Sequence, residues 1–238
     1  MKVLILGASG ATGKLVVQQL VKRGIHVRMV VRESAIIPVN ISYDKKIEVI
    51  KGNINDFNIA KIMDLLKDCD SVISCLGHNI SLKGIFGRPR KLVFNTVTKI
   101  VEALKSLKLN KKFILMSTTA YTNKKINEKN SPGEKIIFLL LKILLPPHKD
   151  NMLAADYLVY NLDSKIKIDW VAVRPDSLFD EETESAYEIH HYKIRSPIFN
   201  PGKTSRINVS HFMAELVTND ELWQKWKNNT PVIYNKES

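Results

Sequence analysis

A glycine-rich loop, residues 7–13 with the sequence GASGATG, is the part of the chain best suited to bind an anion. Gly7 would let the chain turn sharply out of a strand, and Gly10 would let a pyrophosphate approach the backbone. Gly13 would let a helix pack closely on that strand. The amides at the start of the helix, helped by the helix dipole, would then hold the phosphates.

The segments around this loop predict a strand–turn–helix–strand unit. Residues 3–6 form a short apolar run, which is typical of a strand buried on both faces. Residues 14–22 carry apolar side chains at helical spacing and stop before Gly24, and residues 26–31 are rich in β-formers. The spacing G-x-x-G-x-x-G differs from the common G-x-G-x-x-G. Its place between strand and helix nevertheless favours a dinucleotide-binding site over a turn with a structural role only.

The residue after the second strand indicates which dinucleotide is bound. An acidic residue there would accept hydrogen bonds from the ribose of NAD. This chain has Arg32, whose guanidinium would pair with the 2′-phosphate of NADP. Because the neighbouring Glu33 could turn toward the ribose, NAD stays the alternative. We therefore predict NADP(H) in preference to NAD(H).

Strands and helices continue to alternate along the chain. Further strands are predicted at residues 47–50, 71–76, 113–116 and 169–174, and helices at 59–66, 91–107 and 134–145. This order predicts an α/β fold of the Rossmann type, a doubly wound, mostly parallel sheet in a single domain over residues 1–238. Ligands bind such sheets at the carboxyl ends of the strands. We expect the substrate-side elements in the loops 78–90, 121–150 and 176–205.

Several residues at these strand ends are candidate cofactor contacts. Residues 53–56 could flank the adenine, although Asp56 could equally be the N-cap of the next helix. Ser117 is the candidate catalytic residue, because its hydroxyl could reach the nicotinamide ribose or a substrate carbonyl; the alternative is a cap of the next turn. The predicted cofactor contacts are Gly7, Ser9, Gly10, Ala11, Thr12, Gly13, Arg32, Asn53, Ile54, Cys75, Leu76, Gly77, Ser117, Thr118 and Pro175.

The substrate side is less well marked in the sequence. Phe86 and Arg88 could stack on and neutralise an anionic aromatic substrate such as a flavin phosphate, or they could belong to a solvated basic loop. His190 and His191 have no acidic ligand cluster beside them, and we predict no metal site.

Composition excludes several other classes of protein. An apolar content of 45% with 25% charged residues is ordinary for a soluble globular chain. The net charge of +12 is spread along the sequence without a stacking-aromatic motif, so we expect no nucleic-acid partner. Cys69 and Cys75 lack disulfide or zinc spacing, and residues 1–7 do not form a signal peptide. We predict a cytoplasmic monomer or homodimer that acts on a small molecule.

The apolar segment 134–145 is too short to span a bilayer. We predict a buried or dimer-facing helix there in preference to a membrane-surface anchor, and we expect no membrane partner.

Five stretches together resemble a known family: the glycine loop, Val31-Arg32, and residues 116–119, 170–175 and 205–213. They are similar to the atypical short-chain dehydrogenase/reductase group, which includes the NmrA-like regulators and flavin reductase/biliverdin-IXβ reductase. The resemblance implies an NADPH-dependent reductase of a flavin (FMN or FAD), a quinone or a similar conjugated acceptor. It leaves two alternatives, a non-catalytic NADP(H)-sensing regulator and a nucleotide-dependent epimerase or isomerase.

The chain departs from the usual chemistry of this group. Tyr121 and Lys125 have the Tyr-x-x-x-Lys spacing, but Tyr121 lies too soon after Ser117 and in a polar loop, so we expect the spacing to be coincidental. Many relatives carry a lysine four residues before an acid on the helix that precedes the sixth strand. Asp156 matches the acid, whereas Met152 occupies the lysine position. The nearby residues 148–149 are expected on a loop surface.

Overall fold

The main sheet is mostly parallel and has the strand order β3-β2-β1-β4-β5-β6-β10-β8. The computed structural model describes residues 1–37, 44–78, 90–162 and 168–236. Adjacent strands of the sheet are parallel except β10 and β8. The bounds are β1 Lys2–Leu6, β2 His26–Val31, β3 Ile47–Lys51, β4 Ser71–Ser74, β5 Lys112–Met116, β6 Trp170–Pro175, β8 Tyr187–His190 and β10 Val232–Asn235. The predicted α/β, Rossmann-type sheet is confirmed.

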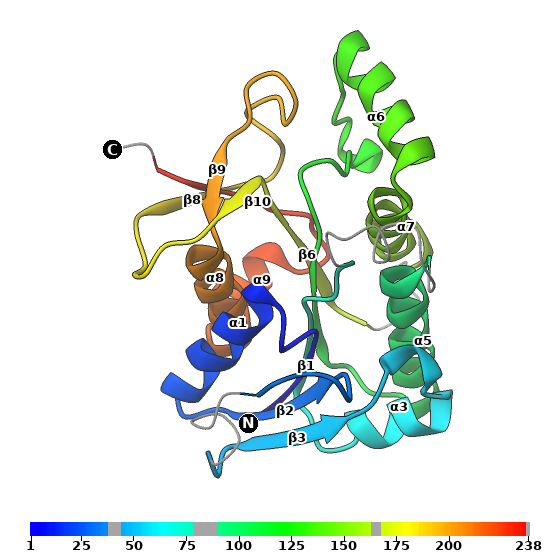
Figure 1. The fold of residues 1–238 in the computed structure, drawn as a ribbon, viewed down its shortest axis with the longest axis vertical. Helices are drawn as coiled ribbons and strands as arrows, with labels where there is room; N and C mark the ends of the chain where they lie inside the picture. The colour runs from blue at the N-terminus through cyan, green and yellow to red at the C-terminus, as the bar shows by residue number, and fades with distance from the viewer. Residues whose placement is uncertain (38–43, 79–89, 163–167, 237–238) are drawn as a thin grey trace.

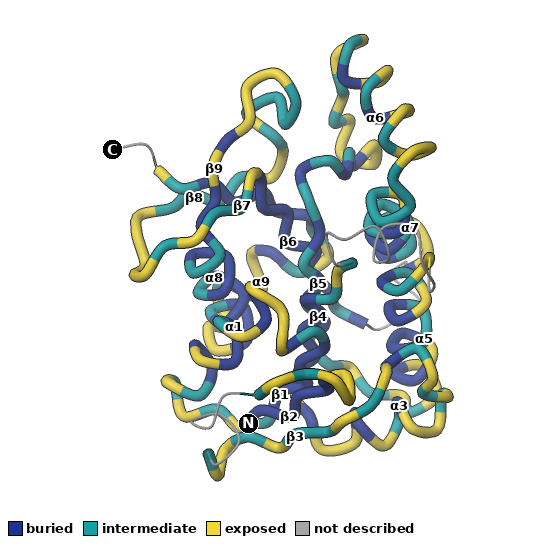
Figure 2. Tube along the Cα trace, viewed as in Figure 1, coloured by how far each residue is buried: buried dark blue, intermediate teal, exposed yellow. Residues whose placement is uncertain are grey.

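Helices cover both faces of this sheet (Figure 1). One face carries α1 (Ala11–Lys22), α8 (Arg206–Thr218) and α9 (Asp220–Trp226), and the other carries α3 (Ile59–Leu66), α5 (Leu92–Leu107) and α7 (Pro146–Asn161). Each face has its own apolar core, so the inner strands β1, β4, β5 and β6 are buried on both sides (Figure 2). This is why these strands read as continuous apolar runs rather than as alternating patterns.

Proline changes the helix boundaries that the sequence suggested. Helix α6 spans Pro132–Leu144, and α7 begins directly afterwards at Pro146. Proline suits the first position of a helix, because the amide it lacks would have no partner there. The expectation that His148 and Lys149 lie on a loop was therefore wrong, since both belong to the first turns of α7.

Helix α6 projects from the body of the molecule (Figure 1). Its Phe138 is buried, but the opposite face is open to solvent, with Ile136, Leu139 and Ile143 exposed by 62%, 59% and 68%. The expectation of a buried helix over 134–145 is wrong for this face, and a dimer contact stays a prediction. Within the ranges that the structure describes, no helix is both long and apolar enough to cross a bilayer.

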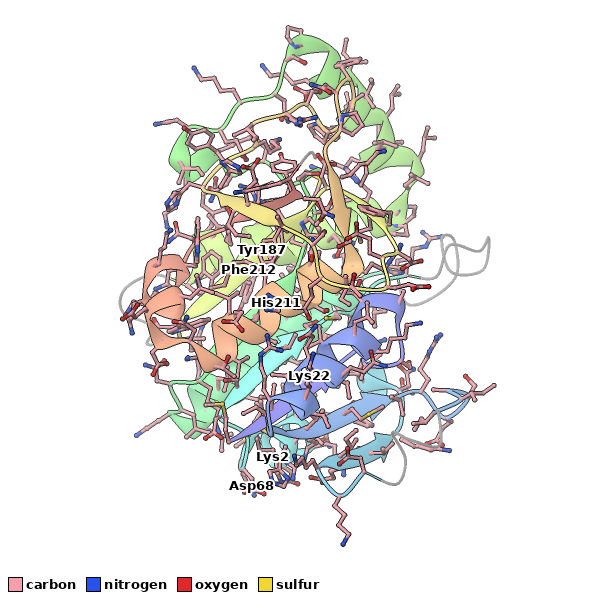
Figure 3. The ribbon with its side chains drawn as sticks, turned by 90° about the vertical axis from the view of Figure 1, so that its left-hand side faces the viewer. Lys2, Lys22, Asp68, Tyr187, His211 and Phe212 are labelled. Carbon is pink, nitrogen blue, oxygen red and sulfur yellow. The ribbon has the colours of Figure 1, made fainter. Side chains whose placement is uncertain are left out.

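The region after β6 contains short strands rather than one long loop. β7 (Ser177–Phe179) and β9 (Lys203–Ser205) pair in parallel, and β8 joins the main sheet. Tyr187 on β8 lies against α8, where its hydroxyl hydrogen-bonds His211 Nδ1 at 2.8 Å and its ring meets Phe212 edge-on (Figure 3). The edge strand β8 is thereby attached to the helical layer.

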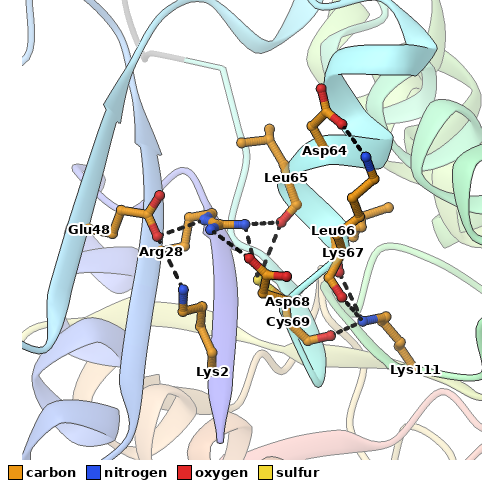
Figure 4. A network of polar contacts seen from close by, with 10 residues as sticks. All are labelled: Lys2, Arg28, Glu48, Asp64, Leu65, Leu66, Lys67, Asp68, Cys69 and Lys111. Atoms are coloured by element: carbon orange, nitrogen blue, oxygen red, sulfur yellow. Dashed lines mark hydrogen bonds and ion pairs between the residues drawn. The ribbon is translucent and has the colours of Figure 1, made fainter.

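A polar network holds the carboxyl end of α3 against β2 (Figure 4). Arg28 on β2 donates to Glu48 Oε2 at 2.9 Å and to the Leu65 carbonyl at 2.8 Å. Lys111 donates to the carbonyl groups of Leu66 and Cys69. Two cations therefore satisfy carbonyl groups at the negative end of a helix, where positive charge is stabilising.

A second buried cation connects β6 to the segment that precedes α6. The Arg174 side chain is fully buried, and its Nη1 lies 2.7 Å from Glu128 Oε2, which is 4% exposed. Its Nε donates to the Thr230 carbonyl at 2.7 Å and its Nη1 to the Tyr121 carbonyl at 3.1 Å. The guanidinium therefore joins three separate parts of the chain.

Glu128→Gln should destabilise the fold, because it leaves the buried Arg174 charge without its carboxylate. Removing one partner of a buried pair costs about 3–5 kcal/mol, and chemical denaturation would measure the loss. The control is Asp180→Asn, which breaks the Arg206–Asp180 pair at 3.0 Å, where Asp180 is 81% exposed. That change should cost less than about 1 kcal/mol. Equal losses in the two variants would contradict the special role of Arg174.

Candidate functional site

A cavity of about 810 Å³ lies at the carboxyl ends of the central strands. Its size is typical of a small-molecule site, and its place is the edge where the chain order reverses between β1 and β4. The predicted contacts that line it are Gly7, Ser9, Gly10, Ala11, Thr12, Arg32, Asn53, Ile54, Cys75, Leu76 and Gly77. Lining residues that the sequence did not single out as cofactor contacts include Glu33, His78, Leu92, Met116, Leu178 and Arg206.

Gly7 and Gly13 are required by the turn from β1 into α1. Gly7 has a φ of +75°, and a Cβ added to it would lie 2.6 Å from the Cys75 carbonyl oxygen. A Cβ on Gly13 would collide with the Gly7 carbonyl oxygen. Gly13 is not among the residues that line the cavity. Its lack of a side chain lets α1 begin close to the end of β1.

Gly10 has a different role, because its backbone is not strained. Its φ of −75° and ψ of 166° are open to any residue, and the nearest atom to an added Cβ is the Gly7 carbonyl oxygen at 3.2 Å. It is the N-cap of α1 without a side-chain cap, and the first turn contains no acidic residue. The first amides of α1 are thus available to an anion in the cavity.

Two arginines give the cavity positive charge at separate places. Arg32 begins a turn after β2, closed by a hydrogen bond of 2.9 Å from the Ala35 amide to the Arg32 carbonyl. Its side chain is exposed and forms no ion pair with other residues in the described ranges. Arg206 begins α8 and pairs with Asp180 at 3.0 Å. A contact between the Arg32 guanidinium and a phosphate group stays a prediction.

Cys75 shapes the site through its backbone rather than its sulfur. Its amide donates to the Leu6 carbonyl at 2.9 Å, and its own carbonyl oxygen lies against Gly7. Burial raises the pKa of the Cys75 thiol to about 12. The thiol stays protonated at neutral pH and is not a nucleophile there.

The candidates at the ends of β5 and β6 are not among the residues that line the cavity. Met116 lines it, whereas Ser117 and Thr118, which follow β5, and Pro175, which ends β6, do not. The Ser117 hydroxyl is buried and makes no hydrogen bond within the described part of the chain. The Thr118 hydroxyl accepts a hydrogen bond from the Ala120 amide at 3.2 Å, a turn cap of the kind considered for Ser117. A cofactor or catalytic role for these residues stays a prediction.

After β3, asparagines form the caps. The Asn53 side chain accepts from the Asn55 amide at 3.3 Å in the 3₁₀ turn η1, Ile54–Asp56. The N-cap of α3 is Asn58, whose side chain accepts from the Lys61 amide at 2.9 Å. The alternative that Asp56 caps this helix was wrong.

Other predicted candidates lie away from the cavity or outside the description. Phe86 and Arg88 fall outside the described residues. His190 pairs with Glu188 at 3.1 Å, and His191 packs on Trp226. Among the residues described, no group of three or more His, Cys, Asp or Glu side chains could hold a metal ion.

The Tyr121 side chain does not line the cavity and belongs to the apolar core on the α7 side of the sheet. Burial, and then the negative charge of the nearby Asp156, raise the pKa of Tyr121 above its ordinary value. The Tyr121 hydroxyl makes no hydrogen bond of good geometry among the described residues, and the Lys125 amine donates instead to the Val159 carbonyl at 3.0 Å. A catalytic tyrosine needs a neighbouring lysine that lowers its pKa, and this arrangement does the opposite.

A sequence model of the NAD(P)H-binding family matches residues 7–220. The chain belongs to this NAD(P)H-binding family. A search of curated protein sequences gives no match.

Solved structures from the same fold class are similar over nearly the whole chain. A short-chain dehydrogenase/reductase from Veillonella parvula in complex with NADP has a TM-score of 0.71 and 17% identity, covering 98% of this chain and 94% of that one. A candidate NADH-flavin reductase from Streptococcus pneumoniae has a TM-score of 0.68 and 17% identity, with 99% and 100% covered. ChuY, an anaerobilin reductase from Escherichia coli, has a TM-score of 0.68 and 14% identity, with 100% and 98% covered. At these identities the likeness concerns the fold.

Gly10→Ala should weaken nucleotide binding while leaving the fold intact, because the new methyl group occupies the approach to the α1 amides. We expect the dissociation constant for NADPH, measured by calorimetry, to rise about tenfold or more, which corresponds to about 1.4 kcal/mol. Gly13→Ala is the matched control within the same loop. It should lower the unfolding free energy more than Gly10→Ala does, because its methyl group meets backbone. Unchanged NADPH affinity in the Gly10 variant would contradict the phosphate site.

Proposed function

We propose that the chain is an NADPH-dependent reductase of a flavin, a quinone or another conjugated acceptor. The observation that carries this proposal is that one cavity includes the glycine loop, Arg32 and the residues after β4. A dinucleotide laid across the sheet edge needs these groups together, at the phosphates, at the adenosine and at the nicotinamide end. The class of the acceptor is proposed from the resemblance of the sequence to the flavin reductase/biliverdin-IXβ reductase group.

The residues present fit the cofactor. The uncapped first turn of α1 and the open side of Gly10 suit a pyrophosphate, and Arg32 suits the 2′-phosphate. Asn53 and Ile54 would flank the adenine, and Leu76 and Gly77 would lie along the nicotinamide ribose. In this proposal the anionic groups of the cofactor meet amides and a guanidinium rather than carboxylates, apart from Glu33.

The protein's part in the reaction would be chiefly one of alignment. When bound, the reduced dinucleotide supplies a hydride. Three apolar side chains of the cavity wall, Leu92, Met116 and Leu178, would exclude water and offer a flat acceptor an apolar surface. Holding donor and acceptor in contact removes much of the entropic barrier, so such a reaction needs few protein groups.

Replacing Arg32 should change which nucleotide is preferred. Arg32→Ala removes a charge-assisted contact worth about 1.5–3 kcal/mol, so we expect about 10–100-fold weaker NADPH binding and nearly unchanged NADH binding. Calorimetric titration of both nucleotides measures this. Glu33→Gln, in the same exposed turn, is the control and should not weaken NADPH binding. Equal losses for both nucleotides in Arg32→Ala would show that Arg32 does not contact the 2′-phosphate.

The reductase assignment is tested by following NADPH oxidation at 340 nm with the purified chain. The acceptors are FMN, menadione and 2-cyclohexenone, each added separately. We expect acceptor-dependent oxidation with tighter binding of NADPH than of NADH. Tight binding without turnover on any acceptor would favour a sensing regulator, and failure to bind either nucleotide would overturn the assignment.

A further inference from the structure

A buried histidine–aspartate pair reaches the cavity from the end of β4. His78 lines the cavity, and its Nε2 lies 2.8 Å from Asp150 Oδ2 on α7. The histidine side chain is 6% exposed and the aspartate side chain is fully buried. Removing the Asp150 side chain from water costs free energy unless it is hydrogen-bonded, so its partners in the core matter for the fold.

The Asp150 side chain caps the start of α5. Its Oδ2 accepts a hydrogen bond from the Val93 amide at 2.8 Å, and its Oδ1 accepts one from the Phe94 amide at 2.9 Å. The N-cap residue of α5, Lys91, provides no side-chain cap, so Asp150 takes that place from another helix. Two amides and the positive end of the helix dipole stabilise its negative charge.

The contact with Asp150 leaves one nitrogen of His78 available. Both Asp150 oxygens accept hydrogen bonds from backbone amides, so we assign the hydrogen between the two side chains to His78 Nε2, which donates to Oδ2. The other ring nitrogen, Nδ1, has no hydrogen-bonding partner within the ranges that the structure describes. Asp150 therefore orients the ring through one nitrogen and leaves the other for a ligand of the cavity.

We propose that His78, oriented by Asp150, is the proton donor to the oxygen of a conjugated carbonyl acceptor bound in the cavity. This inference rests on the proposed function and narrows its substrate class. The hydride forms a bond to the β-carbon of the acceptor, the C=C π electrons shift to form a double bond to the carbonyl carbon, and the C=O π electrons move to oxygen. That oxygen takes the Nδ1 proton of a ring that carries a hydrogen on both nitrogens, which leaves an enol and a neutral ring. The ring regains its proton from solvent and the enol returns to the ketone, so that one hydride and one proton enter the product.

The acceptor class follows from the need for a proton. Hydride transfer to a flavin nitrogen leaves an anion that is stable enough to be protonated later from water, so an oriented acid adds little. Hydride transfer to a conjugated carbonyl leaves an enolate, which is a much stronger base. General acid catalysis typically contributes about 10²–10⁴-fold in such a step. An oriented acid at the cavity therefore favours a carbonyl acceptor.

The test compares two acceptors in His78→Asn. With 2-cyclohexenone or menadione we expect kcat to fall about 100-fold or more, since one general acid is lost. With FMN we expect kcat to stay close to that of the unchanged chain. NADPH affinity, measured by calorimetry without acceptor, should also be preserved. His190→Asn is the control, because His190 Nε2 also lies close to a carboxylate, 3.1 Å from Glu188 Oε1, but makes no hydrogen bond among the described residues and does not line the cavity.

Each other outcome overturns the inference. Equal losses on both acceptors, or no loss on either, would show that His78 delivers no proton. Turnover of FMN without turnover of any carbonyl compound would reject the acceptor class while leaving the reductase assignment intact. No turnover on any acceptor would reject both the acceptor class and the reductase assignment.

A second variant gives a supporting result. We expect added imidazole to restore turnover of His78→Ala on the carbonyl acceptor alone, because imidazole can replace the missing acid.

Asp150 acts as a positioning residue, and NMR tests this without turnover. In the ¹⁵N-labelled chain, the spectrum of the His78 ring should show a hydrogen on Nε2. In Asp150→Asn the proportions of the two ring tautomers should change. The same variant should lower kcat for the carbonyl acceptor by a larger factor than it raises KM. Because the amide oxygen can still accept from one of the two α5 amides, Asp150→Asn should lower the thermal unfolding temperature less than Asp150→Ala does. An unchanged His78 ring spectrum in Asp150→Asn would overturn the positioning role.

Discussion

The close approach of the Gly7 carbonyl to the first turn of α1 determines where the cavity can form. With Gly7 at a φ of +75° and no side chain at Gly13, the chain leaves β1 and enters the helix within a few residues. The start of α1 then lies at the sheet edge beside the ends of β2 and β4. A side chain at Gly13 would push α1 away from the end of β1, and a side chain at Gly7 would collide with the Cys75 carbonyl after β4.

Buried charges connect the elements around this centre. Arg28 donates a hydrogen bond to a carbonyl group at the end of α3, and Asp150 accepts hydrogen bonds from amides at the start of α5. Arg174 joins β6 to Tyr121 and Glu128. In the first two cases a charged side chain from one element supplies hydrogen bonds that a helix lacks at its end. Arg32 contrasts with them, because it is exposed and has no ion-pair partner among the described residues.

The fold and the glycine loop could be predicted because their signals are local. Apolar runs, helical spacing and three glycines identify the strands, the helices and the turn without knowledge of distant contacts. The strand β10 and the lining residue Arg206 depend on which segments meet in space, and their sequences carry no such pattern. His78 followed directly on Cys75-Leu76-Gly77, but its partner Asp150 lies 72 residues away, so the pair could not be recognised.

Two local sequence signals led to wrong predictions around α6 and α7. The segment 134–145 is apolar almost throughout, which suggested burial, yet α6 contacts the body of the molecule on one side only. The residues that follow the pair Pro146-Pro147 were expected on a loop surface, but these prolines begin the new helix α7. Both errors come from signals that state a local preference and leave the surroundings undetermined. Helix α7, which carries Asp150, was obscured by that second error.

The place of β6 between β5 and β10 has a consequence for the rate of folding. Parallel strands pair only after a long crossover is closed, and the Arg174–Thr230 hydrogen bond spans 56 residues. Until the segment around Thr230 docks, the guanidinium lacks one of its acceptors and the edge of β6 is open to other strands. Chains rich in such distant contacts fold slowly, and their unfinished sheet edges are where they aggregate.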